Sequence, residues 1–269
     1  MDRAAVVGES IRYSLSPKIF LFLSKKLERP LSYQILELDR RGFQNIFKKK
    51  VDFIGWNITI PYKEAILPHL SKISRRAKRV GAVNVVRFED EKLFGENTDA
   101  FGIAQTLREQ KHFRKQKSAV LFGAGGAARA VAYVLGEMKV QRIFVVNRSR
   151  KNAASLCRHF NRLYPKSTFI NGMKEKSDPI PLFINSTPMQ NKGPFAFESH
   201  GGKKSLAFDL VYRSNRTPFL RQAAAHGIKT VNGLDMLIWQ AIQAWEIWYG
   251  RVSGKQRLKN EVKKYLMRT

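Results

Sequence analysis

A glycine-rich segment in the middle of the chain carries the clearest chemical pattern in the sequence. Residues 123–128 read Gly-Ala-Gly-Gly-Ala-Ala, fit the pattern G-x-G-x-x-[GA], and follow an apolar run at 118–122. Between a strand and a helix, the first glycine permits a tight turn and the second lets the backbone approach a pyrophosphate. The helix that follows offers free N–H groups and the positive end of its dipole to phosphates. The segment therefore predicts a dinucleotide site that includes Gly123, Ala124, Gly125, Gly126 and Ala127.

The end of the next expected strand indicates which dinucleotide binds. Sites that prefer NAD usually place Asp or Glu there to hold the ribose 2′-hydroxyl. This chain reads Asn147-Arg148-Ser149-Arg150-Lys151 at that point, with no carboxylate and three cations. Cations can pair with a 2′-phosphate, so the segment favours NADP, with Arg148 as the expected contact. The alternative is an ordinary strand-to-helix turn in a generally basic protein.

Two earlier segments place polar side chains where strands are expected to end, at the edge of a parallel sheet that faces ligands. In the segment 57–63, Pro61 is expected to start a helix that holds Lys63 in its first turn. In the segment 95–99, Asn97 or Thr98 can cap a helix beginning near Asp99, whose carboxylate the helix dipole favours. Taken alone, Lys63 is better explained as a solvated surface lysine, and Asp99 is better explained as a helix cap.

The elements that must position these groups alternate between β-like and helical runs, which indicates an α/β fold with a mostly parallel N-terminal sheet. In the first hundred residues we expect strands at 4–8, 32–38, 52–58, 83–88 and 92–95, and helices at 17–27, 42–50, 61–70 and 71–79. Further along we expect strands at 118–122, 142–147, 168–171, 182–185, 205–209 and 229–231, and helices after the glycine-rich turn, at 217–226 and at 233–249. The second half is therefore predicted to be a doubly wound, Rossmann-type domain.

Composition excludes several classes of protein. The 269 residues are 43% hydrophobic, as in ordinary globular proteins, and no window approaches the apolar length of a membrane helix. The single cysteine, Cys157, cannot form an internal disulfide, so we expect a cytoplasmic protein without a membrane anchor. The formal charge of +28 raises the alternative of a nucleic-acid-binding protein on a borrowed fold. The basic runs lack interleaved aromatics and known nucleic-acid motifs, so solvated helix faces explain them better, and no specific nucleic-acid partner is expected.

Short motifs along the chain occur in a fixed order. They are Ser14-Leu15-Ser16-Pro17, the segment 57–63 as N-x-T-x-P-x-K, Gly81-Ala82-Val83-Asn84, Gly95-Glu96-Asn97-Thr98-Asp99, the glycine-rich loop, Asn147-Arg148-Ser149, Asn185-Ser186-Thr187-Pro188-Met189, Asp209-Leu210-Val211-Tyr212, and 233–237 leading to Gln240. This ordered series resembles the shikimate dehydrogenase family along nearly the entire chain. The resemblance implies two α/β domains, residues 1–101 with 236–269 for substrate and residues 102–235 for NADP, with the active site in the cleft between them.

The resemblance also implies the roles of individual residues. Shikimate or 3-dehydroshikimate is the implied substrate, and Lys63 and Asp99 are the implied catalytic pair. The remaining implied substrate contacts are Ser14 and Ser16 to the carboxylate with Tyr212 nearby, and Thr59, Asn84, Asp99 and Gln240 to the ring hydroxyls. The implied cofactor contacts are those of the glycine-rich loop together with Asn147, Arg148, Ser149, Thr187, Met189, Gly233 and Met236. No metal is implied, and the chain is expected to be a monomer or a homodimer.

The implied reaction moves a hydride between nicotinamide and a carbinol carbon and one proton at its oxygen. Protonated Lys63 would donate to the developing alkoxide, with ionised Asp99 keeping it charged and aimed. Two positions depart from the family pattern: Gln190 stands where glycine is expected, and Asn152 where a second basic residue often binds the 2′-phosphate. The alternative within the enzyme class is a quinate/shikimate dehydrogenase using NAD or NADP. Ser16 favours shikimate, because quinate-using relatives often carry threonine there.

Overall fold

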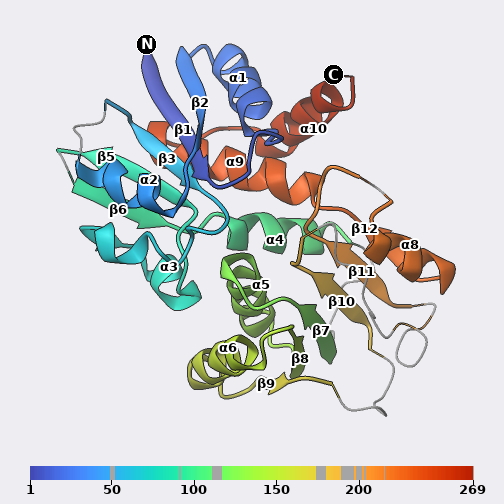
Figure 1. Ribbon diagram of the computed structural model, residues 1–269. Helices are drawn as coiled ribbons and strands as arrows, with labels where there is room; N and C mark the ends of the chain where they lie inside the picture. Colours follow the sequence, from blue (N-terminus) through green and yellow to red (C-terminus); the bar gives the residue numbers. More distant parts are fainter. Residues whose placement is uncertain are drawn as a thin grey trace. The chain divides into compact units, whose positions relative to one another are not determined.

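The computed structural model describes residues 1–48, 52–90, 92–110, 117–173, 180–188, 197, 202, 204–214 and 216–268. The chain divides into two compact units (Figure 1). The first comprises Met1–Gly102 and Ile238–Thr269, and the second comprises Ile103–Leu237. Two helices carry the chain across these boundaries, α4 (Asp99–Arg108) and α9 (Leu234–Tyr249). No helix in the described ranges is long and apolar enough to span a membrane.

The first unit contains a six-stranded sheet in the order β2-β1-β3-β5-β6-β4. Its strands are β1 (Asp2–Gly8), β2 (Leu31–Glu37), β3 (Gly55–Ile58), β4 (Lys72–Ile73), β5 (Val85–Glu89) and β6 (Lys92–Glu96). Its further helices are α1 (Ser16–Lys26), α2 (Arg40–Asn45), η1 (Ile46–Lys48), η2 (Leu67–His69), α3 (Arg75–Val80) and α10 (Lys255–Leu266). The sheet is mostly parallel, as predicted, although β5 runs antiparallel to both of its neighbours.

Alternating side chains give this sheet two different faces. Ala5 and Val7 of β1 point into a cluster with Trp56, Phe43 and Tyr62, on the side covered by α2. The opposite face is lined by small residues of β1 and β3 and is covered by aromatic rings from α1 and α9. A side chain at Gly55 would collide with the indole of Trp248, which explains why glycine is needed there. Figure 1 shows α1 and α10, which contact each other, beside this sheet.

The helix predicted for 61–70 is wrong, and so is the one for 71–79. Residues 61–66 form successive turns that lead into the short 3-10 helix η2, and residues 71–79 divide between β4 and α3. The carbonyl of Lys63 accepts a hydrogen bond from the backbone N–H of Val83, so it is not available for a helical bond. Pro68 has no N–H to donate one turn back. Long-range pairing with the segment before β5 therefore replaces the helical pattern.

The second unit is a parallel six-stranded sheet in the order β12-β11-β10-β7-β8-β9. Its strands are β7 (Ser118–Phe122), β8 (Arg142–Val146), β9 (Thr168–Asn171), β10 (Leu182–Asn185), β11 (Leu206–Asp209) and β12 (Lys229–Val231). Its helices are α5 (Gly126–Glu137), α6 (Arg150–Leu163) and α8 (Pro218–Ala225). The chain winds outward from β7 to β9 and then returns to β10 on the other side of β7, which confirms the predicted doubly wound order. Dinucleotides bind at such a reversal point, beyond the carboxyl ends of the strands.

Candidate active site

Lys63 and Asp99 form an ion pair within the first unit. Nζ of Lys63 lies 2.5 Å from Oδ2 of Asp99, and their side chains are 14% and 5% exposed. Lys63 stands in the turns after β3, and Asp99 is the first residue of α4. The short contact fixes the direction in which the Lys63 side chain points. The pair therefore places an amine and a carboxylate together at the end of the strands.

Asn84, just before β5, fixes the other side of the Asp99 carboxylate. Its amide nitrogen donates to Oδ1 of Asp99 at 2.9 Å and lies 3.0 Å from Oγ1 of Thr98. Its amide oxygen accepts from the backbone N–H of Thr98 at 2.6 Å. Oε1 of Gln240, on α9, lies 3.4 Å from both the Asn84 amide nitrogen and Oγ1 of Thr98. Lys63, Asn84, Asp99 and Gln240 are thus brought into one network, which also contains Thr98.

The start of α4 is held by Asn97, which settles which residue caps it. Oδ1 of Asn97 accepts a hydrogen bond from the backbone N–H of Ala100 at 3.0 Å. Its amide nitrogen donates to the carbonyl of Ala82 at 2.9 Å, and the side chain is fully buried. Asn97 therefore positions Asp99, while Thr98 turns toward Asn84. The role of Thr98 was missed among the expected site residues, although it lies inside the motif that contains Asp99.

Two serines precede or begin α1. Oγ of Ser14 accepts a hydrogen bond from the backbone N–H of Ser16 at 3.2 Å. Ser14 is half-buried, and Ser16, the first residue of α1, is buried. Thr59 follows β3 and is half-buried, with its N–H bonded to the carbonyl of Val7 at 2.9 Å. All three lie in the first unit with Lys63 and Asp99, and no hydrogen bond given by the structure joins them directly to that pair.

Tyr33 and Asn57 are two further polar residues of this unit that hydrogen-bond with each other. Neither was among the expected site residues. The phenol of Tyr33 donates to Oδ1 of Asn57 at 2.7 Å. The amide nitrogen of Asn57 faces the carbonyl of Asn84 at 3.5 Å. Asn57 could have been found from its place in the segment 57–63. Nothing in the local sequence of β2 marks Tyr33.

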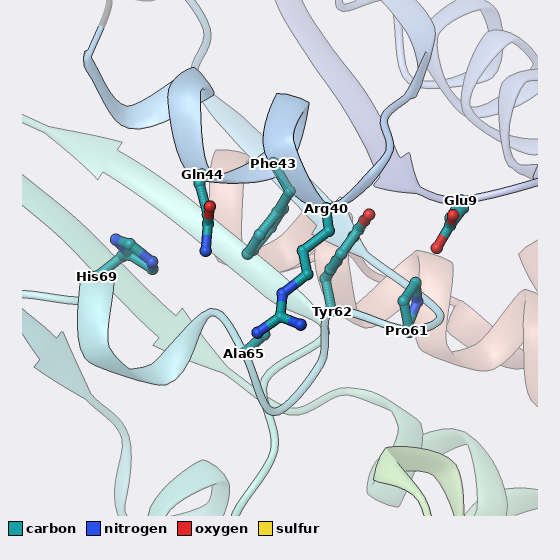
Figure 2. A pocket seen from close by; sticks show the side chains of 8 residues that line it. All are labelled: Glu9, Arg40, Phe43, Gln44, Pro61, Tyr62, Ala65 and His69. Carbon is teal, nitrogen blue, oxygen red and sulfur yellow. The ribbon is translucent and has the colours of Figure 1, made fainter.

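A cavity of about 350 Å³ opens beside the turn that leads to Lys63 (Figure 2). Its lining residues are Glu9, Arg40, Phe43, Gln44, Pro61, Tyr62, Ala65 and His69. The rings of Phe43 and Tyr62 are stacked, with centroids 4.0 Å apart, and the phenol of Tyr62 donates to the carbonyl of Leu38. None of the residues of the Lys63–Asp99 network lines this cavity. The stacked rings of Phe43 and Tyr62 instead belong to the hydrophobic core next to the turn that leads to Lys63.

In the second unit, the glycine-rich segment forms the turn that its pattern predicts. Gly123 has a φ of +111°, which favours glycine, and a Cβ there would collide with the hydroxyl of Ser186. Gly125 is the N-cap of α5, and a Cβ there would meet nothing within 4 Å. Ala128 is 1% exposed, so its small side chain allows α5 to pack closely on the sheet. Gly125 is exposed, and the first N–H groups of α5, at Gly126 and Ala127, have no partner within the helix, which fits a pyrophosphate.

The neighbouring strand ends bring further expected cofactor residues to the same edge of this sheet. Asn147 follows β8, and its amide nitrogen donates to the carbonyl of Ser149 at 3.0 Å. Ser149 caps α6 by accepting from the N–H of Asn152, and Arg148 between them is exposed. Thr187 follows β10, which pairs with β7 on the side opposite β8. An exposed guanidinium with no carboxylate at this strand end suits a 2′-phosphate.

The remaining expected contacts also belong to the second unit. Gly233 precedes α9 and packs against the backbone of Leu210, where a Cβ would collide with the carbonyl oxygen. Met236, in the first turn of α9, is buried. Tyr212 follows β11 and is half-buried. Met189 lies outside the described residues.

Two family models match the chain. Residues 6–86 match the shikimate dehydrogenase substrate binding domain, and residues 106–192 match shikimate / quinate 5-dehydrogenase. Among curated proteins, the shikimate dehydrogenase (NADP(+)) of Caldicellulosiruptor saccharolyticus is 34% identical over 98% of this chain and 98% of its own length.

Solved structures of related dehydrogenases also match the chain over nearly its whole length. The shikimate 5-dehydrogenase of Thermus thermophilus, in complex with NADP(H) and shikimate, is 34% identical. It superposes with a TM-score of 0.83 over 98% of this chain and 99% of that one. A quinate dehydrogenase from Corynebacterium glutamicum, in complex with NAD, is 26% identical with a TM-score of 0.83, over 96% of this chain and 97% of that one.

Proposed function

Since the chain belongs to the shikimate dehydrogenase family, we propose that it interconverts shikimate and 3-dehydroshikimate with NADP, using Lys63 and Asp99 for proton transfer. It is an NADP-dependent oxidoreductase of the shikimate pathway. The observation that carries the assignment of the proton-transfer groups is the pair of Lys63 and Asp99, held at 2.5 Å and braced by Asn84. The shikimate dehydrogenases of Caldicellulosiruptor saccharolyticus and Thermus thermophilus are each 34% identical to this chain and cover 98% of it.

Proton transfer follows from the geometry of the pair. When bound, the nicotinamide of NADP supplies or accepts the hydride at the carbinol carbon. In the reduction, the ammonium group of Lys63 gives its proton to the oxygen that becomes the hydroxyl. In the oxidation, the neutral amine of Lys63 removes the same proton as the carbon–hydrogen bond breaks. Asp99 keeps the lysine aimed in both directions, and such positioned acid–base groups contribute about 10² to 10⁴ in rate.

Substrate binding is assigned to the polar groups around this pair. Ser14 and Ser16 offer hydroxyl donors to the carboxylate, and Tyr212 is proposed to assist them. The amides of Asn84 and Gln240 can both donate and accept hydrogen bonds, and the carboxylate of Asp99 can accept them. The ring hydroxyls of a polyol, which donate and accept, require such partners. Thr59 adds a further hydroxyl at the end of β3. These assignments rest on the family match and on the network that holds Asn84, Asp99 and Gln240 together.

Cofactor binding is assigned to the second unit. The open N–H groups at Gly125, Gly126 and Ala127 fit the pyrophosphate, with Gly123 and Ala124 forming the turn before them. Arg148 is proposed to pair with the 2′-phosphate, between Asn147 and Ser149. Thr187, Met189, Gly233 and Met236 are proposed to line the rest of the site.

We also propose that the protein is cytoplasmic, because it uses this cofactor and its single thiol is buried and free. We propose that it is a monomer or a homodimer.

The test is the absorbance of reduced nicotinamide after purified protein is mixed with shikimate and NADP. Parallel wells contain NAD in place of NADP, or quinate in place of shikimate. Rapid reduction with shikimate and NADP alone is expected. Faster turnover with quinate or NAD would transfer the assignment to a quinate/shikimate dehydrogenase, and no reduction in any well would contradict the proposed activity.

A further inference from the structure

The cavity of about 350 Å³ beside the turn that leads to Lys63 takes no part in the proposed reaction, since the catalytic pair does not line it. Its volume lies at the lower end of the range for small-molecule sites, roughly 300–1,000 Å³. Figure 2 shows Gln44 and His69 toward one end of the cavity and Glu9 toward the other, with the side chain of Arg40 extending between them. The first unit therefore has space for a small ligand at a second place.

Aromatic packing fixes the inner wall of this cavity. Phe43 and Tyr62 are stacked on each other and are only 2% and 3% exposed. The phenol of Tyr62 donates to the carbonyl of Leu38 at 2.8 Å, so its proton is already used. The ring of His69 is stacked on Phe47, with centroids 4.0 Å apart. Because these groups hold one another in place, the wall is formed before a ligand arrives, which lowers the entropy cost of binding.

Two opposite charges line the cavity without pairing, Arg40 at the start of α2 and Glu9 just after β1. In the part of the chain that the structure describes, neither side chain has a hydrogen bond or an ion pair. The lack of a partner is informative for Glu9, because the chain has 49 Lys and Arg against 21 Asp and Glu. Glu37, by comparison, is paired with Arg12. The two charges therefore leave the space between them to a ligand that can meet both.

The charges and the walls together determine the class of ligand. The guanidinium of Arg40 has a planar set of N–H donors that fits a carboxylate. The carboxylate of Glu9 only accepts hydrogen bonds, so it suits an ammonium group. The two stacked rings of the inner wall are nearly buried, so apolar contact is left to Pro61 and Ala65, which are exposed. A short aliphatic skeleton satisfies such a wall, because no ring face is left for stacking.

We propose that this cavity is a second ligand site, which takes a small zwitterion with an aliphatic skeleton, such as a free α-amino acid. Arg40 binds the carboxylate of the ligand and Glu9 binds its ammonium group. The carbon skeleton lies against Pro61 and Ala65. The site does not include the catalytic pair, and the inference does not depend on the proposed reaction.

The probe is L-leucine, because it carries both charges on a branched aliphatic skeleton. It is compared with 4-methylpentanoate, which lacks the ammonium group, and with 3-methylbutylamine, which lacks the carboxylate. Each compound is titrated into the full chain, and binding is followed by two-dimensional amide NMR. Leucine should bind about three- to fivefold more tightly than either comparison compound, the scale of one exposed charge pair. Equal affinity for leucine and either comparison compound, or no saturable change with leucine, would overturn the proposal.

Arg40→Gln and Glu9→Gln test the two charges separately, and both side chains are exposed, so neither change should disturb folding. Arg40→Gln should weaken leucine and 4-methylpentanoate about three- to fivefold and leave 3-methylbutylamine unchanged. Glu9→Gln should weaken leucine and 3-methylbutylamine by the same factor and leave 4-methylpentanoate unchanged. Arg41→Gln is the matched control, because Arg41 is an exposed neighbour on α2 that does not line the cavity. Wild-type affinity for leucine in both cavity variants would contradict the assignment.

Competition with shikimate shows whether leucine binds in this cavity or at the catalytic pair. Saturating shikimate should leave the dissociation constant of leucine unchanged. Displacement of leucine by shikimate would place leucine in the active site and overturn the inference. A titration of shikimate alone tests the proposed function separately: if shikimate does not bind, the proposed function is contradicted, and the zwitterion site is still decided by the variants of Arg40 and Glu9.

Discussion

Nζ of Lys63 and Oδ2 of Asp99 meet at 2.5 Å, although 36 residues separate them along the chain. Lys63 reaches this point from the turns after β3, and Asp99 from the first turn of α4. Each element is fixed by its own contacts: the carbonyl of Lys63 is bonded to Val83, and Asn97 caps α4. The ion pair is therefore set by the scaffold before any substrate arrives, which is the requirement for directed proton transfer.

Removing either member of this pair should abolish most of the activity. Lys63→Ala and Asp99→Asn are each expected to lower kcat by about 10² to 10⁴, because the proton donor is lost or no longer aimed. The measurement is a pH–rate profile for shikimate oxidation at saturating NADP. Lys72→Ala, at an exposed position on β4, is the control and should keep wild-type turnover. Near-wild-type turnover in both site variants would refute the assigned roles.

Arg148 should decide cofactor preference. Arg148→Ala is expected to raise the KM for NADP by about 10- to 100-fold, which corresponds to the loss of charge-assisted bonds to a phosphate. The KM for NAD should hardly change, because NAD has no 2′-phosphate. Arg158→Ala, exposed on α6, should leave both constants unchanged. An equal rise for NAD and NADP would show that Arg148 does not contact the 2′-phosphate.

The Asn97 cap should be needed for stability. Asn97→Ala removes the bonds to Ala100 and Ala82 from a fully buried position, so the free energy of unfolding should fall by about 1–3 kcal/mol. Urea denaturation followed by circular dichroism measures this loss. Asn45→Ala, at an exposed position in α2, should change stability by less than about 0.5 kcal/mol. Equal free energies of unfolding for the two variants would show that the Asn97 cap does not stabilise the protein.

Cys157 should be nearly inert in the folded protein. Burial raises the pKa of the Cys157 thiol from 9.0 to about 11, so much less thiolate is present near neutral pH. At pH 8, alkylation by iodoacetamide should be about 100-fold slower in the native protein than in urea, because the reactive thiolate is that much scarcer. The native rate should continue to rise as the pH approaches 11, while the unfolded rate levels off near 9. Comparable rates in both states would show that the thiol is accessible.

Features that depend on neighbours along the chain could be predicted from the order of amino acids alone. The glycine-rich turn at Gly123, the doubly wound strand order and the cation at Arg148 all follow from local spacing and strand–helix alternation. The mostly parallel first sheet and the helix beginning at Asp99 were also predicted correctly. These features are readable because a tight turn, a helix cap or a buried strand is specified by a few consecutive residues.

Features that depend on long-range contacts emerged only from the folded chain. Lys63 stands in a turn and not in a helix, because its carbonyl pairs with Val83 from a later segment. Folding also placed Asn84 and Gln240, which are 156 residues apart, in one network with Asp99. The hydrogen bond between Tyr33 and Asn57 likewise depends on the assembled sheet, since Tyr33 lies on β2 and Asn57 on β3. A hydrogen bond between distant segments leaves no periodic pattern in either segment. Such a bond can therefore be identified only in the tertiary structure, where the sheet and helices are packed together.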